Sequence, residues 1–258
     1  MLLVVDAGNT NIVFGVFQGE ELLHSWRIST YRSHHRTGDE LTILLHNLLG
    51  LIGLSFDSLD GAAVCSVVPP LNDGIKRMCH ESLKIDTLFI DSKEQDFITL
   101  NYRVPEEVGA DRIVNAVAAK ELFGSPVVVV DFGTATTFDV VTRDGSYDGG
   151  LIFPGIGISS EALFTRTSKL PKVEFCKPPH MVGKSTEESI QAGLYYGYVK
   201  MVKGILEELK KELPEASVVS TGGYSRMINR NNPGLFNSVE KDLTVKGLKI
   251  CYDSYKGN

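Results

Sequence analysis

The chain has 258 residues, 43% hydrophobic and 22% charged, a globular mixture that excludes a disordered chain, a coiled coil and a fibrous repeat. Its 26 basic and 32 acidic residues give a net charge of -6, which argues against nucleic acid or an anionic membrane as a partner. The four cysteines form no C-x-x-C pair, which fits a reducing cytoplasm, and we expect no targeting or membrane-spanning segment.

The first part of the chain mixes strands and helices. Apolar runs bounded by turn residues predict strands over residues 2–5, 12–17, 22–28, 61–68 and 87–90. Apolar residues at helical spacing predict helices over residues 39–51, 72–83 and 110–123. This order of elements is typical of an α/β protein.

The chain then begins again. An apolar strand over residues 127–130 leads into Asp131-Phe132-Gly133, which lies 125 residues after Asp6-Ala7-Gly8, and another strand follows at 135–141. Because the flanking elements repeat in the same order, we expect two similar halves, residues 1–124 and 125–258.

Four further elements follow the repeated strands of the second half. A long helix is predicted over residues 186–213, capped by Ser185 and Glu188, and a strand over 216–220. The predicted apolar face of that helix consists of Ile190, Leu194, Tyr198, Met201, Ile205 and Leu209. Residues 155–159 are interpreted as a glycine turn, and the tail at 243–250 as either a strand or a helix.

The turn after the first strand, residues 6–11, is a candidate phosphate-binding loop. A tight turn between two strands can point successive backbone N–H groups at one anion, and Gly8 lets a phosphate approach the backbone. Thr10 and Asn11 offer short polar donors, and Asp6 could hold a divalent cation directly or through water. The plain alternative is an ordinary hairpin turn.

The repeated turn, residues 131–137, has the same pattern and includes Gly133 and Thr134. Two such loops facing each other across a cleft could hold the two ends of a polyphosphate. After a later strand, Thr221-Gly222-Gly223 could let a base or ribose lie against the backbone, although such glycine pairs also occur in plain loops.

A third candidate is Gly109-Ala110-Asp111-Arg112, which opens the predicted helix 110–123. A helix N-terminus attracts negative charge, and an arginine can bind a carboxylate through two parallel hydrogen bonds. The carboxylate of Asp111 could accept a hydroxyl proton. The plain alternative is helix capping with a surface ion pair.

The segment Gly183-Lys184-Ser185-Thr186 imitates the end of the phosphate-binding motif G-x-x-x-x-G-K-[ST]. We reject this interpretation, because Pro178 stands where the first glycine would be and no apolar strand precedes it.

Together the two D-x-G-x-T loops and the later T-G-G resemble the superfamily of acetate kinases, sugar kinases and actin. More narrowly, "DAGNTN", "GADR" and "DFGTATTFD" in this order are similar to the type III pantothenate kinases. Tyr102, the "FPG" at 153–155 and the "GKST" at 183–186 fit the same family, and the resemblance runs from residue 1 to about 225.

The resemblance implies an actin-like, ribonuclease H-like α/β fold with the active site in a cleft between the two halves. It implies transfer of phosphate from ATP with Mg²⁺ to pantothenate, giving 4′-phosphopantothenate, the first step of coenzyme A synthesis. It also implies a cytoplasmic homodimer whose substrate residues lie near the subunit interface. Without it, the residues alone indicate phosphate transfer from a nucleotide to a small hydroxyl compound.

The resemblance also assigns roles to residues. Asp111 is the general base, Asp6 acts through magnesium, and Asp131 holds potassium or ammonium. ATP is bound by Asp6, Gly8, Asn9, Thr10, Asn11, Gly133 and Thr134, and pantothenate by Tyr102, Gly109, Ala110, Asp111, Arg112 and Thr186.

Two alternatives stay open at this stage. One is a different small-molecule kinase or a phosphatase with the same fold. The other is a regulatory accessory factor without catalytic activity, against which the intact Asp6, Asp111 and Asp131 argue.

Overall fold

The computed structural model describes residues 1–30, 36–93 and 95–257, which fall into two compact units. Unit 1 comprises Met1–Leu122 and the C-terminal segment that begins at Asp242, and unit 2 comprises Phe123–Lys241. The expected second half, residues 125–258, includes this C-terminal segment, whereas the structure groups the segment with unit 1. Each unit is described by itself.

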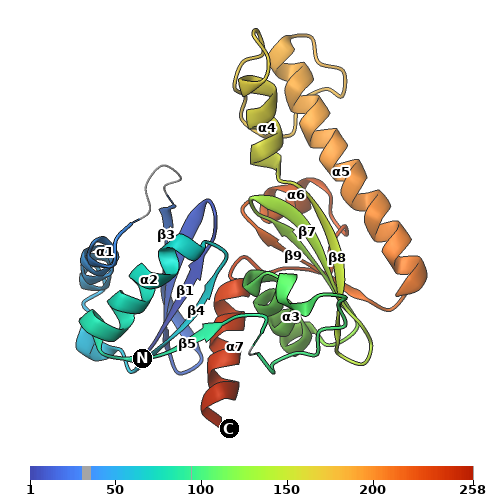
Figure 1. The fold of residues 1–258 in the computed structure, drawn as a ribbon. Coiled ribbons are helices and arrows are strands. Elements are labelled where there is room, and N and C mark those ends of the chain that lie inside the picture. The colour runs from blue at the N-terminus through green and yellow to red at the C-terminus, as the bar shows by residue number, and fades with distance from the viewer. Residues whose placement is uncertain (31–35, 94, 258) are drawn as a thin grey trace. The chain divides into compact units, whose positions relative to one another are not determined.

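Unit 1 is built on a five-stranded sheet in the order β3-β2-β1-β4-β5 (Figure 1). The strands β1, β2 and β3 are antiparallel neighbours, whereas β4 and β5 run parallel to β1. All five strands were predicted, and their bounds are β1 (Leu2–Ala7), β2 (Asn11–Gln18), β3 (Glu21–Ser29), β4 (Gly61–Ser66) and β5 (Asp86–Ile90).

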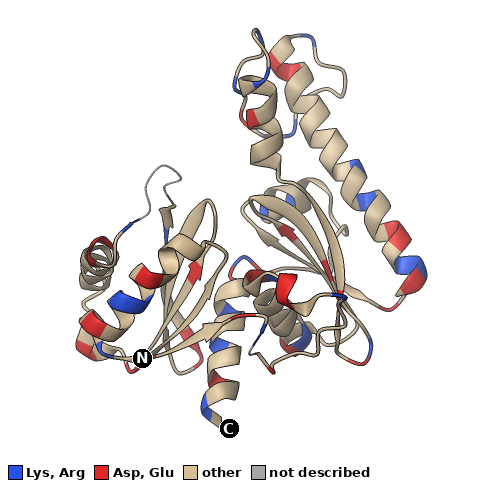
Figure 2. Ribbon diagram, viewed as in Figure 1, with Lys and Arg blue, Asp and Glu red and all other residues tan. Residues whose placement is uncertain are grey.

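Two helices, α1 (Gly38–Gly50) and α2 (Pro69–Arg77), cover one face of this sheet. The charged residues of α2, coloured in Figure 2, are Asp73, Lys76 and Arg77. All three are exposed, whereas Leu71 and Ile75 are buried in the core. The prediction began this helix at residue 72, but Pro69 and Pro70 belong to its first turn, where a missing N–H costs nothing. The helix continues as a π-helical segment, Met78–Leu83.

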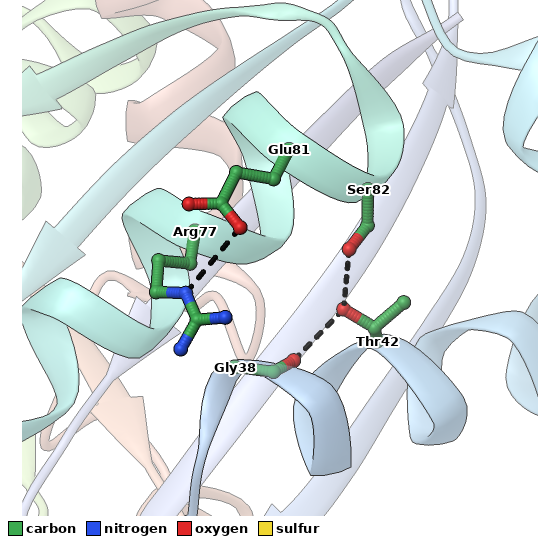
Figure 3. A network of polar contacts seen from close by, with 5 residues as sticks. All are labelled: Gly38, Thr42, Arg77, Glu81 and Ser82. Atoms are coloured by element: carbon green, nitrogen blue, oxygen red, sulfur yellow. Dashed lines mark hydrogen bonds and ion pairs between the residues drawn. The ribbon is translucent and has the colours of Figure 1, made fainter.

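Polar contacts join α1 to this π-helical segment (Figure 3). The hydroxyl of Thr42 donates to the carbonyl oxygen of Gly38 at 2.8 Å and lies 3.1 Å from Ser82 Oγ. Nearby, Arg77 Nε donates to Glu81 Oε2 at 3.4 Å. Such exposed contacts contribute little to stability, so the buried apolar side chains beneath them hold the layer together.

The other face of the unit 1 sheet is covered by α7 (Leu243–Gly257), which packs on β1, β2 and β4. The tail that the sequence left as strand or helix is therefore a helix. Thr244 Oγ1 donates to Asn115 Oδ1 at 2.8 Å and so connects α7 to α3 (Ala110–Phe123), whose bounds match the prediction. Side chains at alternate positions of β1, among them Asp6, point to this face.

Unit 2 repeats the plan of unit 1. Its sheet has the order β8-β7-β6-β9-β10, with β6, β7 and β8 antiparallel and β9 and β10 parallel to β6. This is the strand order of the first sheet, so the predicted internal repeat is confirmed. The strands are β6 (Val127–Phe132), β7 (Ala135–Val141), β8 (Tyr147–Pro154), β9 (Ser217–Gly222) and β10 (Ser238–Val239), of which β8 and β10 were not predicted.

The helices α4 (Ile156–Thr165), α5 (Thr186–Glu212) and α6 (Ser225–Asn231) pack on one face of this sheet. The predicted glycine turn at 155–159 is wrong, because α4 begins at Ile156, whose side chain is buried in the core. The hydroxyl of Tyr198 on α5 donates to the carbonyl oxygen of Pro154 and lies 2.6 Å from Ser159 Oγ, which fixes the start of α4.

The bounds of α5 agree with the prediction within one residue, and its predicted apolar face packs on the core of unit 2. Ile190 and Leu194 are buried, and Tyr198, Met201, Ile205 and Leu209 are partly buried against the same core. The prediction missed further buried positions, which are Ala192, Tyr195, Val199, Val202 and Leu206. At the start of the helix Ser185 Oγ accepts from the Glu188 N–H, as predicted. The carboxylate of Glu188, however, accepts from the Lys184 N–H at 2.6 Å.

All four cysteines are free thiols, and Cys176 is half-buried whereas the other three are buried. None of the helices in the described part of the chain combines the length and the apolar content needed to cross a membrane.

Candidate active site

Asp6 lies near the end of β1, beside a buried cysteine on the next strand. Because β1 and β4 are parallel and pair in register, Asp6 stands opposite Cys65, and the thiol Sγ donates to Asp6 Oδ1 at 3.5 Å. The thiol of Cys65 is itself buried. The contact could be predicted only by pairing the first predicted strand in parallel with the predicted strand at 61–68, which sets Asp6 opposite Cys65.

Asp111 occupies the first turn of α3. Its Oδ1 accepts the Arg112 N–H at 2.9 Å, so the carboxylate folds back over the start of the helix. Gly109 precedes the helix, and a Cβ atom at this position would lie only 2.5 Å from Asp111 Oδ1. Gly109 is therefore required for the position of the Asp111 carboxylate.

The carboxyl groups of Asp6 and Asp111 interact electrostatically. The pKa of Asp6 is raised to about 7, mainly by burial and in addition by the nearby charge of Asp111, against the smaller opposing effects of the Cys65 thiol and Arg27. Burial also raises the pKa of Asp111, which the hydrogen bond from the Arg112 N–H and the Arg112 charge partly offset. Two half-buried carboxylates whose charges interact suit a divalent cation with its phosphate ligands.

The loop that follows Asp6 is a closed turn with an exposed polar tip. The Gly8 N–H donates to the Asn11 carbonyl oxygen at 2.9 Å, and Thr30 Oγ1 donates to the Gly8 carbonyl oxygen at 2.8 Å. Asn9 and Thr10 at the tip are exposed. This is the shape expected of a loop that presents backbone and side-chain donors to phosphate, and phosphate binding by it remains a prediction.

The other residues predicted to bind pantothenate in unit 1 surround the start of α3. Ala110 and Arg112 are buried, with Arg112 only 8% exposed, and Tyr102 is half-buried in the irregular segment before the helix. A surface ion pair at this turn is thus excluded as the role of Arg112. A buried guanidinium whose charge acts on the carboxylate of the adjacent Asp111 is an arrangement more typical of ligand binding than of helix capping.

In unit 2, Asp131 lies near the end of β6, at the position that repeats Asp6. The loop that follows is closed by the Gly133 N–H, which donates to the Ala135 carbonyl oxygen at 3.0 Å. A Cβ atom at Gly222, where φ is +86°, would lie 2.5 Å from Asp131 Oδ1 and 2.6 Å from the Phe132 backbone. The glycine pair after β9 is thus explained in part by the space that the Asp131 carboxylate needs.

Register pairing gives Asp131 different neighbours from those of Asp6. Asp131 stands between Thr137 on β7 and Thr221 on β9, whereas Asp6 stands between Val13 on β2 and Cys65 on β4. The two aspartates therefore occupy equivalent positions with unequal chemistry: the second has hydroxyl oxygens on both sides.

The last residue of the "DFGTATTFD" motif, Asp139, is a buried acid on β7, the strand next to that of Asp131, and the resemblance assigns it no role. Asp139 and Tyr147 are both 0% exposed. Thr137 Oγ1 donates to Asp139 Oδ2 at 2.8 Å, and the Tyr147 hydroxyl donates to Asp139 Oδ1 at 2.9 Å. Because β8, which carries Tyr147, was not predicted, the sequence did not indicate this cluster.

Thr186 is the first residue of α5 and is exposed. It lines a pocket of about 720 Å³ whose apolar walls include Leu163, Leu170 and Ile190. Residues 166–185, all of which the structure describes, contain no strand, so the rejection of a P-loop at this segment is confirmed. Among the described residues there is also no group of three or more His, Cys, Asp or Glu side chains placed to hold a metal ion.

Comparison with known proteins decides the family. The sequence profile of the type III pantothenate kinases matches residues 2–208. The chain belongs to the type III pantothenate kinase family. It is 47% identical to the type III pantothenate kinase of Syntrophotalea carbinolica over 100% of both chains, and 46% identical to that of Brevibacillus brevis over 98% of both. The protein is therefore a kinase, which implies ATP and a divalent metal ion.

Solved structures show the same fold at low sequence identity. The activator of the 2-hydroxyisocaproyl-CoA dehydratase from Clostridium difficile, solved with bound ADPNP, matches with a TM-score of 0.54 at 14% identity over 100% of this chain and 97% of that one. A polyphosphate/ATP-glucomannokinase from Arthrobacter matches with a TM-score of 0.52 at 13% identity over 100% and 99%. The kinase thus has the predicted two-lobed, actin-like ATPase fold.

Proposed function

We propose that the protein transfers the γ-phosphoryl group of ATP to the primary hydroxyl of pantothenate and so forms 4′-phosphopantothenate, the first step of coenzyme A synthesis. The observation that supports this best is the electrostatic interaction between the half-buried carboxylates of Asp6 and Asp111, the second of which is next to the buried Arg112. In this proposal Asp6 faces the phosphates and Asp111 faces the acceptor hydroxyl. The guanidinium of Arg112 binds the carboxylate of pantothenate.

Asp111 is the general base in this proposal. Its carboxylate is held by the Arg112 N–H at the start of α3, and burial raises its pKa toward the range where a carboxylate takes a proton efficiently. As the oxygen of pantothenate attacks, its proton moves to Asp111, and Arg112 keeps the ionised carboxylate oriented. Phosphoryl transfer depends mainly on such alignment and on charge neutralisation.

The two loops hold the nucleotide. The backbone and polar tip of residues 8–11 face the phosphates in unit 1, and Gly133 and Thr134 supply the equivalent turn in unit 2. Asp6 would hold the magnesium ion, directly or through water, and the bound ion neutralises charge on the transferred phosphate. Tyr102, Gly109, Ala110, Arg112 and Thr186 position pantothenate.

Asp131 holds a monovalent cation, potassium or ammonium, in this proposal. The donors around it fit such an ion, because a carboxylate and two threonines stand together in register and Gly222 leaves space for the carboxylate. A large, weakly hydrated cation accepts oxygen ligands without strict octahedral geometry, whereas magnesium demands it.

The kinase acts in the cytoplasm as a homodimer in this proposal. The homodimer is supported by the surface of the region that contains α4 and α5. Residues 189–199 of α5 carry no charge (Figure 2), and Met181 and Val182 are 67% and 69% exposed, near the apolar pocket beside Thr186. Exposed apolar patches of this kind mark association surfaces.

The oligomeric state is tested by light scattering after gel filtration. Met181→Glu should shift the protein to a monomer, whereas Leu51→Glu, at a side chain that is 76% exposed elsewhere, should leave a dimer. A wild-type monomer at micromolar concentration would refute the dimer.

The activity itself is tested by coupling ADP release to pantothenate, with sugars and acetate as alternative acceptors. We expect ADP release with pantothenate, faster in potassium or ammonium than in sodium at constant ionic strength. Release with a sugar or acetate instead would replace the substrate, and no release with any acceptor would refute kinase activity toward these compounds.

A further inference from the structure

The cluster around Asp139 has a fixed hydrogen-bond direction. An ionised carboxylate accepts hydrogen bonds and donates none, so both partners must donate to it. Thr137 gives its hydroxyl proton to Asp139 Oδ2 and Tyr147 gives its own to Oδ1. Tyr147 thereby holds the carboxylate in place, and Asp139 fixes the direction of the Thr137 hydroxyl proton.

Thr137 also faces Asp131. The two residues are paired across the antiparallel strands β6 and β7, so their side chains leave the same face of the sheet about 4.5–5.5 Å apart at Cβ. A threonine hydroxyl has one proton and two lone pairs. With the proton committed to Asp139, the oxygen of Thr137 can act toward the Asp131 side only as an acceptor of hydrogen bonds or a ligand of cations.

The internal repeat provides a comparison within the chain. Val13 stands opposite Asp6 as Thr137 stands opposite Asp131, and Gly15 stands opposite Val4 as Asp139 stands opposite Val129. The hydroxyl and the buried carboxylate of unit 2 thus replace an apolar side chain and a glycine in unit 1. The fold itself does not need this polar pair, because unit 1 builds the same strands without it.

We propose that Asp139 is a positioning residue of the monovalent-cation site: it accepts the hydroxyl proton of Thr137, and this leaves the Thr137 oxygen as a ligand for the cation that Asp131 binds. The inference rests on the proposed cation at Asp131. It extends the site from one carboxylate to a carboxylate and an oriented hydroxyl.

The test compares three threonine variants with the wild type. Thr137→Val removes the hydroxyl at nearly constant shape, and Thr137→Ser keeps it. Thr136→Val is the matched control, because Thr136 is the neighbouring threonine on the opposite face and its buried hydroxyl has no hydrogen-bond partner among the described residues. Two quantities are measured for each protein. One is the potassium concentration that gives half-maximal activity, and the other is the rise in melting temperature when sodium chloride is replaced by potassium chloride in the presence of magnesium and a non-hydrolysable ATP analogue.

We expect Thr137→Val to raise the half-maximal potassium concentration about tenfold, the effect of one lost polar contact to a charge, with little change in the rate at saturating potassium. It should also lose most of the potassium-dependent rise in melting temperature. Thr137→Ser and Thr136→Val should behave like the wild type. A wild type that responds to potassium and a Thr137→Val variant that responds equally would overturn the inference and leave the cation site in place.

A wild type that shows no preference for potassium in either measurement would instead overturn the cation site, and this inference with it. Asp139→Ala tests the positioning step, because it removes the acceptor of the Thr137 hydroxyl proton and leaves that hydroxyl able to donate toward Asp131. We expect the same change as in Thr137→Val, and no further change when the two substitutions are combined. An Asp139→Ala variant with a wild-type potassium response would refute the positioning role. If that variant does not fold, Thr137→Val and Thr137→Ser decide the question by themselves.

Discussion

Cys65 donates its thiol proton to the carboxylate of Asp6 across two parallel strands, with 3.5 Å between Sγ and Oδ1. A thiol is a weak donor, and it lowers the pKa of Asp6 less than burial and the charge of Asp111 raise it. In the folded, ligand-free kinase Asp6 therefore titrates at about pH 7 instead of near 4. The proton that it retains must leave when a metal ion binds.

The first prediction concerns stability and pH. The pKa of Asp6 is raised from 3.8 when unfolded to about 7 when folded, so between these values the folded state binds more protons. Its contribution to the free energy of unfolding therefore falls as pH rises through this window. We expect the melting temperature of the ligand-free Asp6→Asn variant to exceed that of the wild type by more at pH 7.5 than at pH 5. A difference that is the same at both pH values would contradict the raised pKa.

The second prediction concerns Asp111→Asn. The amide keeps the shape of the side chain but cannot take the hydroxyl proton, so kcat should fall by about 10²–10⁴-fold. Removing the charge should also lower the pKa of Asp6 in the folded state, so the decline of the melting temperature with rising pH should end at a lower pH than in the wild type. Steady-state kinetics and melting curves check both effects. A kcat that stays close to the wild-type value would show that another group is the base.

Most of the first unit could be predicted from sequence, because its strands are apolar runs between clear turns and its helices show regular spacing. The failures have physical causes. The predicted helix begins only at residue 72, after Pro69 and Pro70, although proline also suits the first turn of a helix. Residues 155–159 have the glycines of a turn, but burial of Ile156 against the sheet favours the helix.

In the candidate site, too, the sequence indicates neighbours within one motif but not contacts between distant segments. Residues within one motif, such as Asp111 and Arg112, could be found in the sequence because the helix start places them together. Cys65 and Tyr147 are 59 and 8 residues from their aspartate partners and meet them only through strand pairing or packing. Contacts of this kind depend on register, which no local pattern in the chain specifies.

The third prediction concerns Gly109→Ala. The added Cβ would lie 2.5 Å from Asp111 Oδ1, so the carboxylate must turn away from its hydrogen bond with the Arg112 N–H. Because a displacement of about 1 Å in a catalytic group can cost about 10²-fold, kcat should fall at least tenfold while the protein stays folded. Gly204→Ala is the matched control, since nothing lies within 4 Å of its added Cβ on α5 and the position is outside the proposed dimer surface. It should leave kcat unchanged and slightly raise the melting temperature. Equal kcat values for the two variants would show that the position of the Asp111 carboxylate does not limit the reaction.

The last prediction concerns Arg112→Lys. Arg112 is buried beside Asp111, and its planar guanidinium can bind a carboxylate through two parallel hydrogen bonds, which the single ammonium group of lysine cannot reproduce. We expect the KM for pantothenate to rise about tenfold, a loss of about 1.4 kcal/mol, and the KM for ATP to change by less than about twofold. Arg143→Lys is the matched control, because Arg143 is exposed and forms an ion pair with Glu215, and both of these residues belong to unit 2. This substitution should change neither KM. Equal increases in both KM values would place Arg112 on the nucleotide, and pantothenate would then need another partner for its carboxylate.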